Sequence, residues 1–134
     1  MIVVDASVIV ELVLATPTGA RLESRLASLG QPLNAPHLLS VEVVHALRRF
    51  LRAGSVTADS AEAAVQELEQ LPITRWAHEP LLARMWDLRA NMTAYDATYV
   101  VLAEALGGTL ITTDERLRRA AADFAEVDFL PTVS

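Results

Sequence analysis

The amino-acid sequence predicts an α/β fold, an α/β/α sandwich in which helices cover both faces of a central, mainly parallel sheet. Short apolar runs that are typical of buried strands alternate along the chain with longer segments of helical periodicity. Glycine or proline stands at the ends of many of these segments, where one element stops and another begins. The 134 residues contain no linker, internal repeat or low-complexity tract, so residues 1–134 are expected to form a single domain.

The first half of the chain alternates between strands and helices in this interpretation. Residues 2–5 (IVVD) open with an unbroken apolar run, which is typical of a strand buried on both faces. Pro17 suits the first position of a helix, Gly54 ends a helix, and Thr57 is a good N-cap for the next one. A second, short strand is expected at residues 33–35. The expected helices span residues 7–14, 17–29, 39–53 and 57–70.

The second half continues the same alternation. Residues 73–76 (ITRW) are a further strand candidate, and the apolar residues between Leu81 and Leu88 indicate a helix. Thr93 is expected to open the next helix, which ends where Gly107 interrupts its apolar face. The remaining elements are a strand at residues 109–112, a helix at residues 115–122 and a last strand at residues 127–130.

The first expected helix carries apolar residues all round instead of along one stripe. These residues are Val8, Ile9, Val10, Leu12, Val13 and Leu14. A helix with this pattern is buried on more than one side. Two explanations remain open: an ordinary core helix, or a helix covered in part by a partner protein or a second subunit.

Composition limits the class of protein. Apolar residues make up 52% of the chain, which excludes a disordered chain, and the lack of cysteine excludes a disulfide framework, a zinc–thiolate site and a thiol nucleophile. The apolar N-terminus lacks the basic residues of a signal peptide and is interrupted by Asp5 and Glu11. No run reaches the roughly 18 uncharged apolar residues that a membrane span needs. A soluble, cytoplasmic protein is therefore expected.

The charges are unevenly distributed. The net charge of −6 argues against a nucleic-acid partner, but all 11 basic residues are arginine, whose planar fork suits phosphate better than a point charge does. Several arginines are grouped in two clusters, Arg48, Arg49 and Arg52, and Arg116, Arg118 and Arg119. The clusters are candidate RNA-binding residues, and solvated helix faces are the alternative for each.

Four acidic residues stand at or near the starts of expected helices: Asp5, Glu42, Asp96 and Asp114. Each has an ordinary explanation, because aspartate favours the N-cap and negative charge in the first helical turn interacts well with the macrodipole. Asp96 completes the sequence Thr93-x-x-Asp96, which is close to a capping box. Glu42 is expected in the first turn of its helix. Helix capping therefore accounts for each acid taken singly.

Taken together, the four acids indicate a metal site. Three of them follow apolar or small-residue runs, and the carboxyl ends of parallel strands meet at one edge of a sheet, where the binding crevice opens. Gathered carboxylates repel one another and destabilise the metal-free protein unless a cation neutralises them. Their oxygens suit Mg²⁺ or Mn²⁺, and such an ion can activate water for attack on a phosphodiester. A metal-dependent nuclease is therefore the activity to test.

Other α/β sites with acids at strand ends fit less well. A phosphoryl-accepting receiver domain and a haloacid-type phosphatase both require a lysine, and the chain contains none. Ser7 stands where the phosphatase would carry its second aspartate, and there is no phosphate-binding loop or dinucleotide fingerprint. The histidines, His37, His45 and His78, do not form a ligand or triad set. His45 lies one turn from Glu42 and could line the edge of the site.

With these residues in place, the chain resembles PIN domains, and specifically the VapC-type toxins of bacterial type II toxin–antitoxin systems. The resemblance covers almost the whole chain and rests on four segments: VVDASVIVELV, APHLLSVEVVHALRR, TAYDATYVVLAEALG and LITTDERL. The family's acids fall on Asp5, Glu42, Asp96 and Asp114, its Thr-x-Asp element on residues 112–114, and its small hydroxyl residue on Ser7.

The resemblance implies a PIN-like α/β/α sandwich and an endoribonuclease that depends on Mg²⁺ or Mn²⁺. It also implies that the protein forms a homodimer and is inhibited by a cognate VapB-type antitoxin. Asp5 and Asp96 would be the main metal ligands, and the other two acids would complete the site directly or through water. Ser7 or Thr112 would orient a carboxylate or a substrate oxygen.

One departure concerns the positions just beyond the fourth acid, where some relatives carry a further acid. Arg116 and Leu117 occupy these positions here, so the number of metal ions is open. The alternative function from another class is a catalytically silent PIN-like module that binds RNA or protein. Four intact acids favour the enzyme, because a module that only binds has no reason to tolerate the repulsion between their carboxylates.

Overall fold

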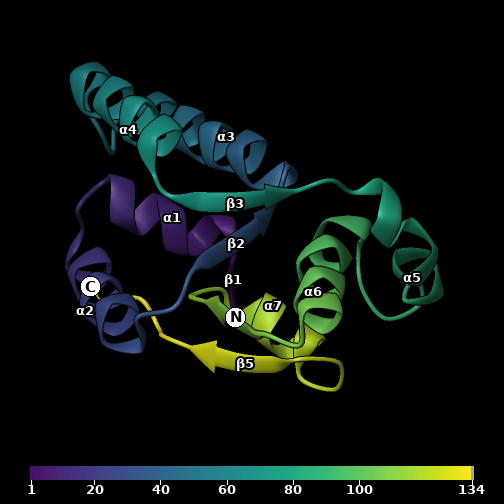
Figure 1. Cartoon of the computed structure of the whole chain (residues 1–134). Helices are drawn as coiled ribbons and strands as arrows, with labels where there is room; N and C mark the ends of the chain where they lie inside the picture. Colours follow the sequence, from purple (N-terminus) through teal and green to yellow (C-terminus); the bar gives the residue numbers. More distant parts are fainter. Residues whose placement is uncertain (134) are drawn as a thin grey trace.

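The computed structural model of the protein describes residues 1–133 and contains a five-stranded sheet between two groups of helices (Figure 1). The strands are β1 (Ile2–Val4), β2 (Leu33–Pro36), β3 (Ile73–Trp76), β4 (Thr109–Thr112) and β5 (Glu126–Phe129). They lie in the order β3-β2-β1-β4-β5, and all neighbouring strands are parallel. The predicted α/β fold with a mainly parallel sheet is therefore confirmed.

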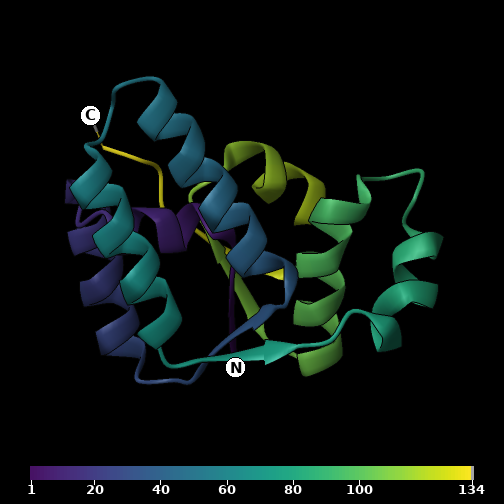
Figure 2. The same cartoon turned by 90° about the horizontal axis from the view of Figure 1, so that it is seen from above.

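The helices connect these strands on both sides of the sheet. They are α1 (Ala6–Val13), α2 (Pro17–Leu29), α3 (Leu38–Arg52), α4 (Ala58–Gln70), α5 (Leu82–Asp87), α6 (Ala94–Leu106) and α7 (Glu115–Ala121), with a 3-10 turn, η1 (Glu79–Leu81), before α5. Helices α1 to α4 gather on one side, and α5 and α6 lie on the other (Figure 2). Helix α7 packs against β4, β5 and α6. Among residues 1–133, none of the helices combines the length and the apolar character needed to cross a membrane.

The strand order reverses direction beside β1. The chain builds β1, β2 and β3 toward one edge of the sheet and then returns to place β4 on the other side of β1. Because crossovers between parallel strands are right-handed, this reversal puts the connecting helices on opposite faces. Val4 of β1 is in register with Ile111 of β4, so the chain leaves both strands at the same edge. Open α/β sheets bind ligands just outside such a reversal point.

Helix α1 is a core helix of this chain. Val8, Ile9, Val10 and Val13 are buried, and α1 packs against α2, α3, α4 and β4. The explanation as an ordinary core helix therefore accounts for these four residues, while Leu12 and Leu14 are only partly buried and cover by a partner or a second subunit stays a prediction. Neighbouring elements of the same chain cover most of the helix, which is why its sequence is apolar on more than one side.

Candidate functional site

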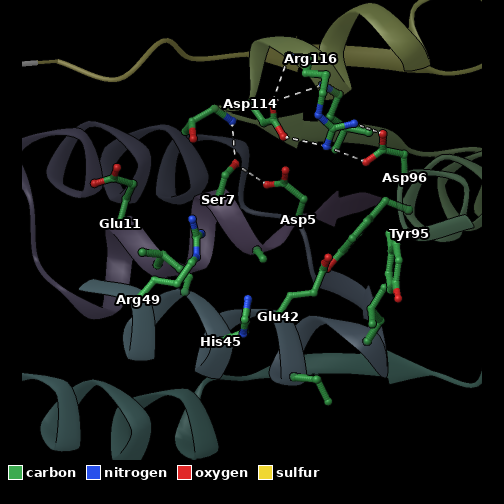
Figure 3. A pocket seen from close by; sticks show the side chains of 18 of the residues that line it. Asp5, Ser7, Glu11, Glu42, His45, Arg49, Tyr95, Asp96, Asp114 and Arg116 are labelled. Carbon is green, nitrogen blue, oxygen red and sulfur yellow. Dashed lines mark hydrogen bonds and ion pairs between the residues drawn. The ribbon is translucent and has the colours of Figure 1, made fainter. Parts of the chain in front are cut away.

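A pocket of ≈ 580 Å³ lies at the carboxyl edge of the sheet, beyond the ends of β1 and β4. All four acids singled out from the sequence line it: Asp5, Glu42, Asp96 and Asp114. Figure 3 shows Asp5 near the centre, Asp96 and Asp114 on one wall, and Glu42 reaching in from α3. The fold thus brings together acidic side chains from two strand ends and two helices.

Asp5 is buried at the junction of β1 and α1. It caps α1, because its Oδ1 accepts a 3.2 Å hydrogen bond from the Val8 amide. Ser7 Oγ donates to the same oxygen at 2.6 Å, and Thr112 Oγ1 donates to Oδ2 at 2.7 Å. Burial raises the pKa of Asp5 to about 6, although these hydrogen bonds oppose the shift. The capping explanation is therefore correct for Asp5, and the same carboxylate also belongs to the pocket.

Ser7 and Thr112 connect the ends of β1 and β4. Ser7 Oγ accepts a 3.0 Å hydrogen bond from the Thr113 amide, and Thr112 Oγ1 accepts a 3.0 Å hydrogen bond from the Asp114 amide. Each hydroxyl therefore donates to Asp5 and accepts from the backbone that leads into α7. The two residues hold the Asp5 carboxylate in one orientation and fix the position of the neighbouring chain.

Glu42 enters the pocket from α3 and is half-buried. Its predicted place in the first turn is wrong, because α3 begins at Leu38 and Glu42 lies in the second turn. The Tyr99 hydroxyl donates a hydrogen bond to Glu42 Oε1. Burial raises the pKa of Glu42, the hydrogen bond from Tyr99 lowers it, and the charge of Asp96 raises it. The sequence does not single out Tyr99, which reads there as part of the apolar face of its helix, although its position one turn after Asp96 on α6 places it next to the site.

Arg116 links Asp96 to Asp114. Its guanidinium forms a two-pronged ion pair with Asp96, in which Nη2 lies 3.1 Å from Oδ1 while Nη1 contacts Oδ2. Nη2 also lies 3.5 Å from Asp114 Oδ2. The hydrogen bonds to Asp96 raise the pKa of Arg116, which keeps the guanidinium charged. A counterion within the acid cluster was not foreseen from the sequence, where Arg116 stood only as a candidate RNA contact.

Helix capping explains the backbone contacts of these two acids in different ways. Thr93 caps α6 by accepting a 3.1 Å hydrogen bond from the Asp96 amide, while the Asp96 carboxylate turns toward Arg116. Asp114 caps α7, because its Oδ1 accepts hydrogen bonds from the Arg116 amide at 2.9 Å and the Leu117 amide at 3.3 Å. Capping therefore accounts for the carboxylate of Asp114 but not for that of Asp96.

The two arginine clusters contribute unequally to the pocket. Arg49 and Arg116 line it. The cluster residues outside its lining are Arg48, Arg52, Arg118 and Arg119. Arg118 and Arg119 pair with Glu115 within α7. RNA binding by the clusters stays a prediction, and the geometry favours one arginine from each cluster.

The pocket also has apolar side chains in its lining, which the pattern of acids in the sequence does not indicate. Val41, Phe50 and Tyr95 line it together with the acids. Tyr95 directly precedes Asp96 on α6 and is 63% exposed. His45 also lines the pocket, as its spacing from Glu42 indicated. The pocket therefore combines carboxylates with aromatic and aliphatic surface.

The donor set fits a hard divalent cation, with one condition. Four carboxylates on the walls of one pocket supply the kind of oxygen ligand that Mg²⁺ and Mn²⁺ use. In the arrangement of residues 1–133 seen here, no three acidic or histidine side chains stand close enough together to hold an ion. The Arg116 guanidinium lies between Asp96 and Asp114. Coordination by several of these carboxylates at once would require this side chain to move aside and the carboxylates to come closer together.

Comparisons with known proteins agree with the fold. The family model for the PIN domain matches residues 2–123. The chain is 38% identical over 130 residues to Ribonuclease VapC12 of Mycobacterium tuberculosis, a match that covers 97% of this chain and 99% of that protein.

Two solved structures show the same fold. VapC20 of Mycobacterium tuberculosis, described as a sarcin-ricin loop cleaving toxin, has a TM-score of 0.69 at 20% identity, with 95% of this chain and 98% of that chain covered. VapBC2 of Rickettsia felis, bound to a DNA fragment from its promoter, has a TM-score of 0.68 at 11% identity, with 96% and 98% covered. On the strength of the domain match and of its identity to VapC12, the chain belongs to the PIN domain family and, within it, to the VapC group.

Proposed function

We propose that this protein is a divalent-metal-dependent endoribonuclease and the toxin of a type II toxin–antitoxin module. The observation that carries the proposal is the convergence of four carboxylates in one pocket at the carboxyl edge of a parallel sheet. The ribonuclease name of VapC12, which matches almost the full length of the chain, supports RNA as the substrate. The mixed polar and aromatic lining of the pocket is compatible with a polynucleotide.

The acids divide into two pairs in this proposal. Asp5 and Asp96 are the main ligands of Mg²⁺ or Mn²⁺, and Glu42 and Asp114 complete the site directly or through water. When bound, the ion lowers the pKa of water and offsets negative charge on the phosphodiester. The raised pKa values of Asp5 and Glu42 mean that both carboxylates bind protons readily in the metal-free protein. Metal binding is therefore expected to compete with protons and to strengthen as pH rises.

Neighbouring side chains orient two of these acids. Ser7 and Thr112 donate to both oxygens of Asp5 and so restrict rotation of its carboxylate. Tyr99 donates to Glu42 and restrains it in the same way. Such restraint matters, because a ligand or base that is held in place needs no reorganisation when the substrate binds.

The RNA chain is proposed to enter over the Arg49 side of the pocket. The guanidinium of Arg49 can pair with a phosphate through its planar fork. The exposed ring of Tyr95 can stack on a nucleobase next to the acids. These contacts would bind RNA despite the net charge of −6, because the basic groups that matter are local.

Helix α3 carries an exposed apolar surface that could receive the antitoxin. Its exposed apolar residues are Val41, Val44 and Leu51, which are 68%, 46% and 42% exposed. Their spacing places them on one side of the helix, and exposed apolar surface of this kind marks protein interfaces. We propose that a cognate VapB-type antitoxin covers this surface and obstructs the pocket. A homodimer of the toxin is proposed from the family resemblance, and light scattering at several concentrations tests it.

Cleavage of RNA by the purified protein tests the proposal. New 5′ ends should form with Mg²⁺ or Mn²⁺ and not with EDTA, and sequencing them identifies the cleavage position. Asp5→Asn should nearly abolish cleavage, whereas Asp123→Asn, an exposed acid outside the pocket lining, should leave it intact. Full activity of Asp5→Asn, or of the wild type in EDTA, would falsify the metal mechanism.

A catalytically silent module that binds RNA or protein is the second candidate. It is favoured by one observation, the pairing of Arg116 with Asp96, which neutralises an acid that the enzyme needs as a ligand. Such a module would bind RNA equally well with and without the cation and would leave the RNA intact. The same cleavage experiment, combined with a gel-shift measurement of binding, separates the two functions.

A further inference from the structure

Arg116 covers a carboxylate that solvent barely reaches. The side chain of Arg116 is 63% exposed, whereas that of Asp96 is 8% exposed. The guanidinium engages both oxygens of Asp96, and Nη2 lies 3.5 Å from Asp114. The Arg116 amide donates a 2.9 Å hydrogen bond to Asp114 Oδ1, which fixes the backbone from which the side chain starts. Arg116 is therefore held at the pocket by two acids at once.

The contacts of Arg116 conflict with metal coordination. A two-pronged pair with a nearly buried carboxylate is stronger than an exposed ion pair, because breaking it leaves a charge in a poorly hydrated place. A divalent cation needs the same oxygens of Asp96 as ligands. The cation and the guanidinium also repel each other at short distance. An ion can therefore bind Asp96 only after Arg116 gives up part of its pairing.

We propose that Arg116 is an internal competitor of the divalent cation. It neutralises Asp96 in the metal-free protein and weakens the affinity of the site for the ion, so that the site forms only when the free metal concentration is high enough to displace the guanidinium. This inference rests on the proposed metal-dependent function and adds a regulatory step to it. Binding of the ion shifts the equilibrium between the paired and the displaced positions of Arg116. The size of the shift equals the free energy by which the ion prefers the displaced position.

Three variants separate direct competition from other effects. Arg116→Gln removes both the charge and the fork, while Arg116→Lys keeps the charge but loses the two-pronged geometry. Both retain the backbone amide that Asp114 caps. Arg84→Gln is the matched control: Arg84 also forms a two-pronged pair, with Glu104 at 2.8 and 3.1 Å, and it lies outside the pocket lining.

Calorimetric titration with Mn²⁺ measures the competition directly. Arg116→Gln should bind Mn²⁺ at least about tenfold more tightly than the wild type, a ratio equivalent to ~1.4 kcal/mol. Arg116→Lys should lie between the two, and Arg84→Gln should match the wild type. In chelator, Arg116→Gln should melt below the wild type, because Asp96 loses its counterion, and it should gain more from added Mn²⁺.

Several outcomes overturn the inference. These are equal Mn²⁺ affinity in the wild type and Arg116→Gln, no Mn²⁺ binding by either protein, or an Arg116→Lys affinity equal to that of the wild type. The last result would show that charge acting at a distance explains the effect. RNA cleavage is measured separately: if the Mn²⁺ affinities follow the expected order but no protein cleaves RNA, the competition stands and the proposed function fails.

Discussion

Thr112 donates a 2.7 Å hydrogen bond to Oδ2 of Asp5, although the two residues lie 107 positions apart in the sequence. Strands β1 and β4 are adjacent and parallel, so the residue that follows β1 meets the last residue of β4. The same Thr112 hydroxyl accepts a 3.0 Å hydrogen bond from the Asp114 amide. One hydroxyl thereby connects the carboxylate of Asp5 with the backbone of Asp114.

Replacing Thr112 by valine should lower the free energy of unfolding by about 1–3 kcal/mol. The change keeps the shape of the side chain but leaves the buried Asp5 carboxylate and the Asp114 amide without their shared partner. Urea unfolding measures the loss. Thr109→Val is the control, because its hydroxyl lies on the same strand and donates to Glu126 at the surface. Equal losses in the two variants would contradict a special role for Thr112.

Tyr99→Phe should shift the acidic limb of the pH–rate profile for RNA cleavage to higher pH. The Tyr99 hydroxyl stabilises the charged form of Glu42, so its removal raises the pKa of Glu42 further above the ordinary value. If ionised Glu42 is required, cleavage then begins at higher pH. A profile that Tyr99→Phe leaves unchanged would show that Glu42 is not the group whose ionisation sets the acidic limb.

The charge reversal Arg49→Glu should weaken RNA binding more than Arg52→Glu. The two residues lie on the same helix, but only Arg49 is part of the pocket lining. Each lost phosphate contact should reduce the slope of log affinity against log salt by about one. Fluorescence anisotropy with labelled RNA at several salt concentrations measures both slopes. Equal slopes in both variants would show that the cluster acts only as a solvated helix face.

The order of elements could be predicted from the sequence, because local patterns determine it. The apolar run at residues 2–4 and the caps Thr57 and Thr93 are local signals that need no knowledge of tertiary contacts. The burial of α1 could not be assigned to one cause in the same way. An apolar helix looks alike whether its own chain or another chain covers it, and the packing of α2, α3 and α4 against α1 is visible only in the folded structure.

The acids of the site could be predicted, but their electrostatics could not. Asp5, Asp96 and Asp114 mark strand ends or helix starts, which a parallel sheet brings to one edge. The pairing of Asp96 with Arg116 depends on how α6 and α7 pack, and it joins residues 20 positions apart. The buried partner Tyr99 reads in the sequence as an ordinary core residue of α6. The number of acids in the sequence therefore overestimates how strongly the four carboxylates repel one another.

The titration of Asp5 should make the metal-free protein less stable as pH rises. Its pKa in the folded state, about 6, lies above the ordinary value of 3.8, so the folded state binds this proton more tightly than the unfolded state. Stability from this group is therefore full below pH ~4 and is lost as pH rises to ~6, by up to about 3 kcal/mol. Glu42, whose pKa is also raised, acts in the same direction.

Urea unfolding in chelator across this pH range tests the effect. Asp5→Asn removes the titration and can still cap α1, so its stability should fall less between pH ~4 and ~6 than that of the wild type. Parallel curves for the two proteins would show that Asp5 ionises in the folded state as it does in the unfolded chain.

Asp96→Asn separates repulsion among the acids from pairing with Arg116. Repulsion alone would make the neutral variant more stable than the wild type in chelator. Because Asp96 is paired with Arg116 through both oxygens, we expect the opposite: the variant should melt at a lower temperature. Added Mn²⁺ should stabilise the wild type by about 2.7 kcal/mol at a hundredfold excess over Kd and should stabilise the variant far less. A higher melting temperature of Asp96→Asn in chelator would mean that repulsion prevails over the ion pair, and an equal response to Mn²⁺ would exclude Asp96 as a ligand.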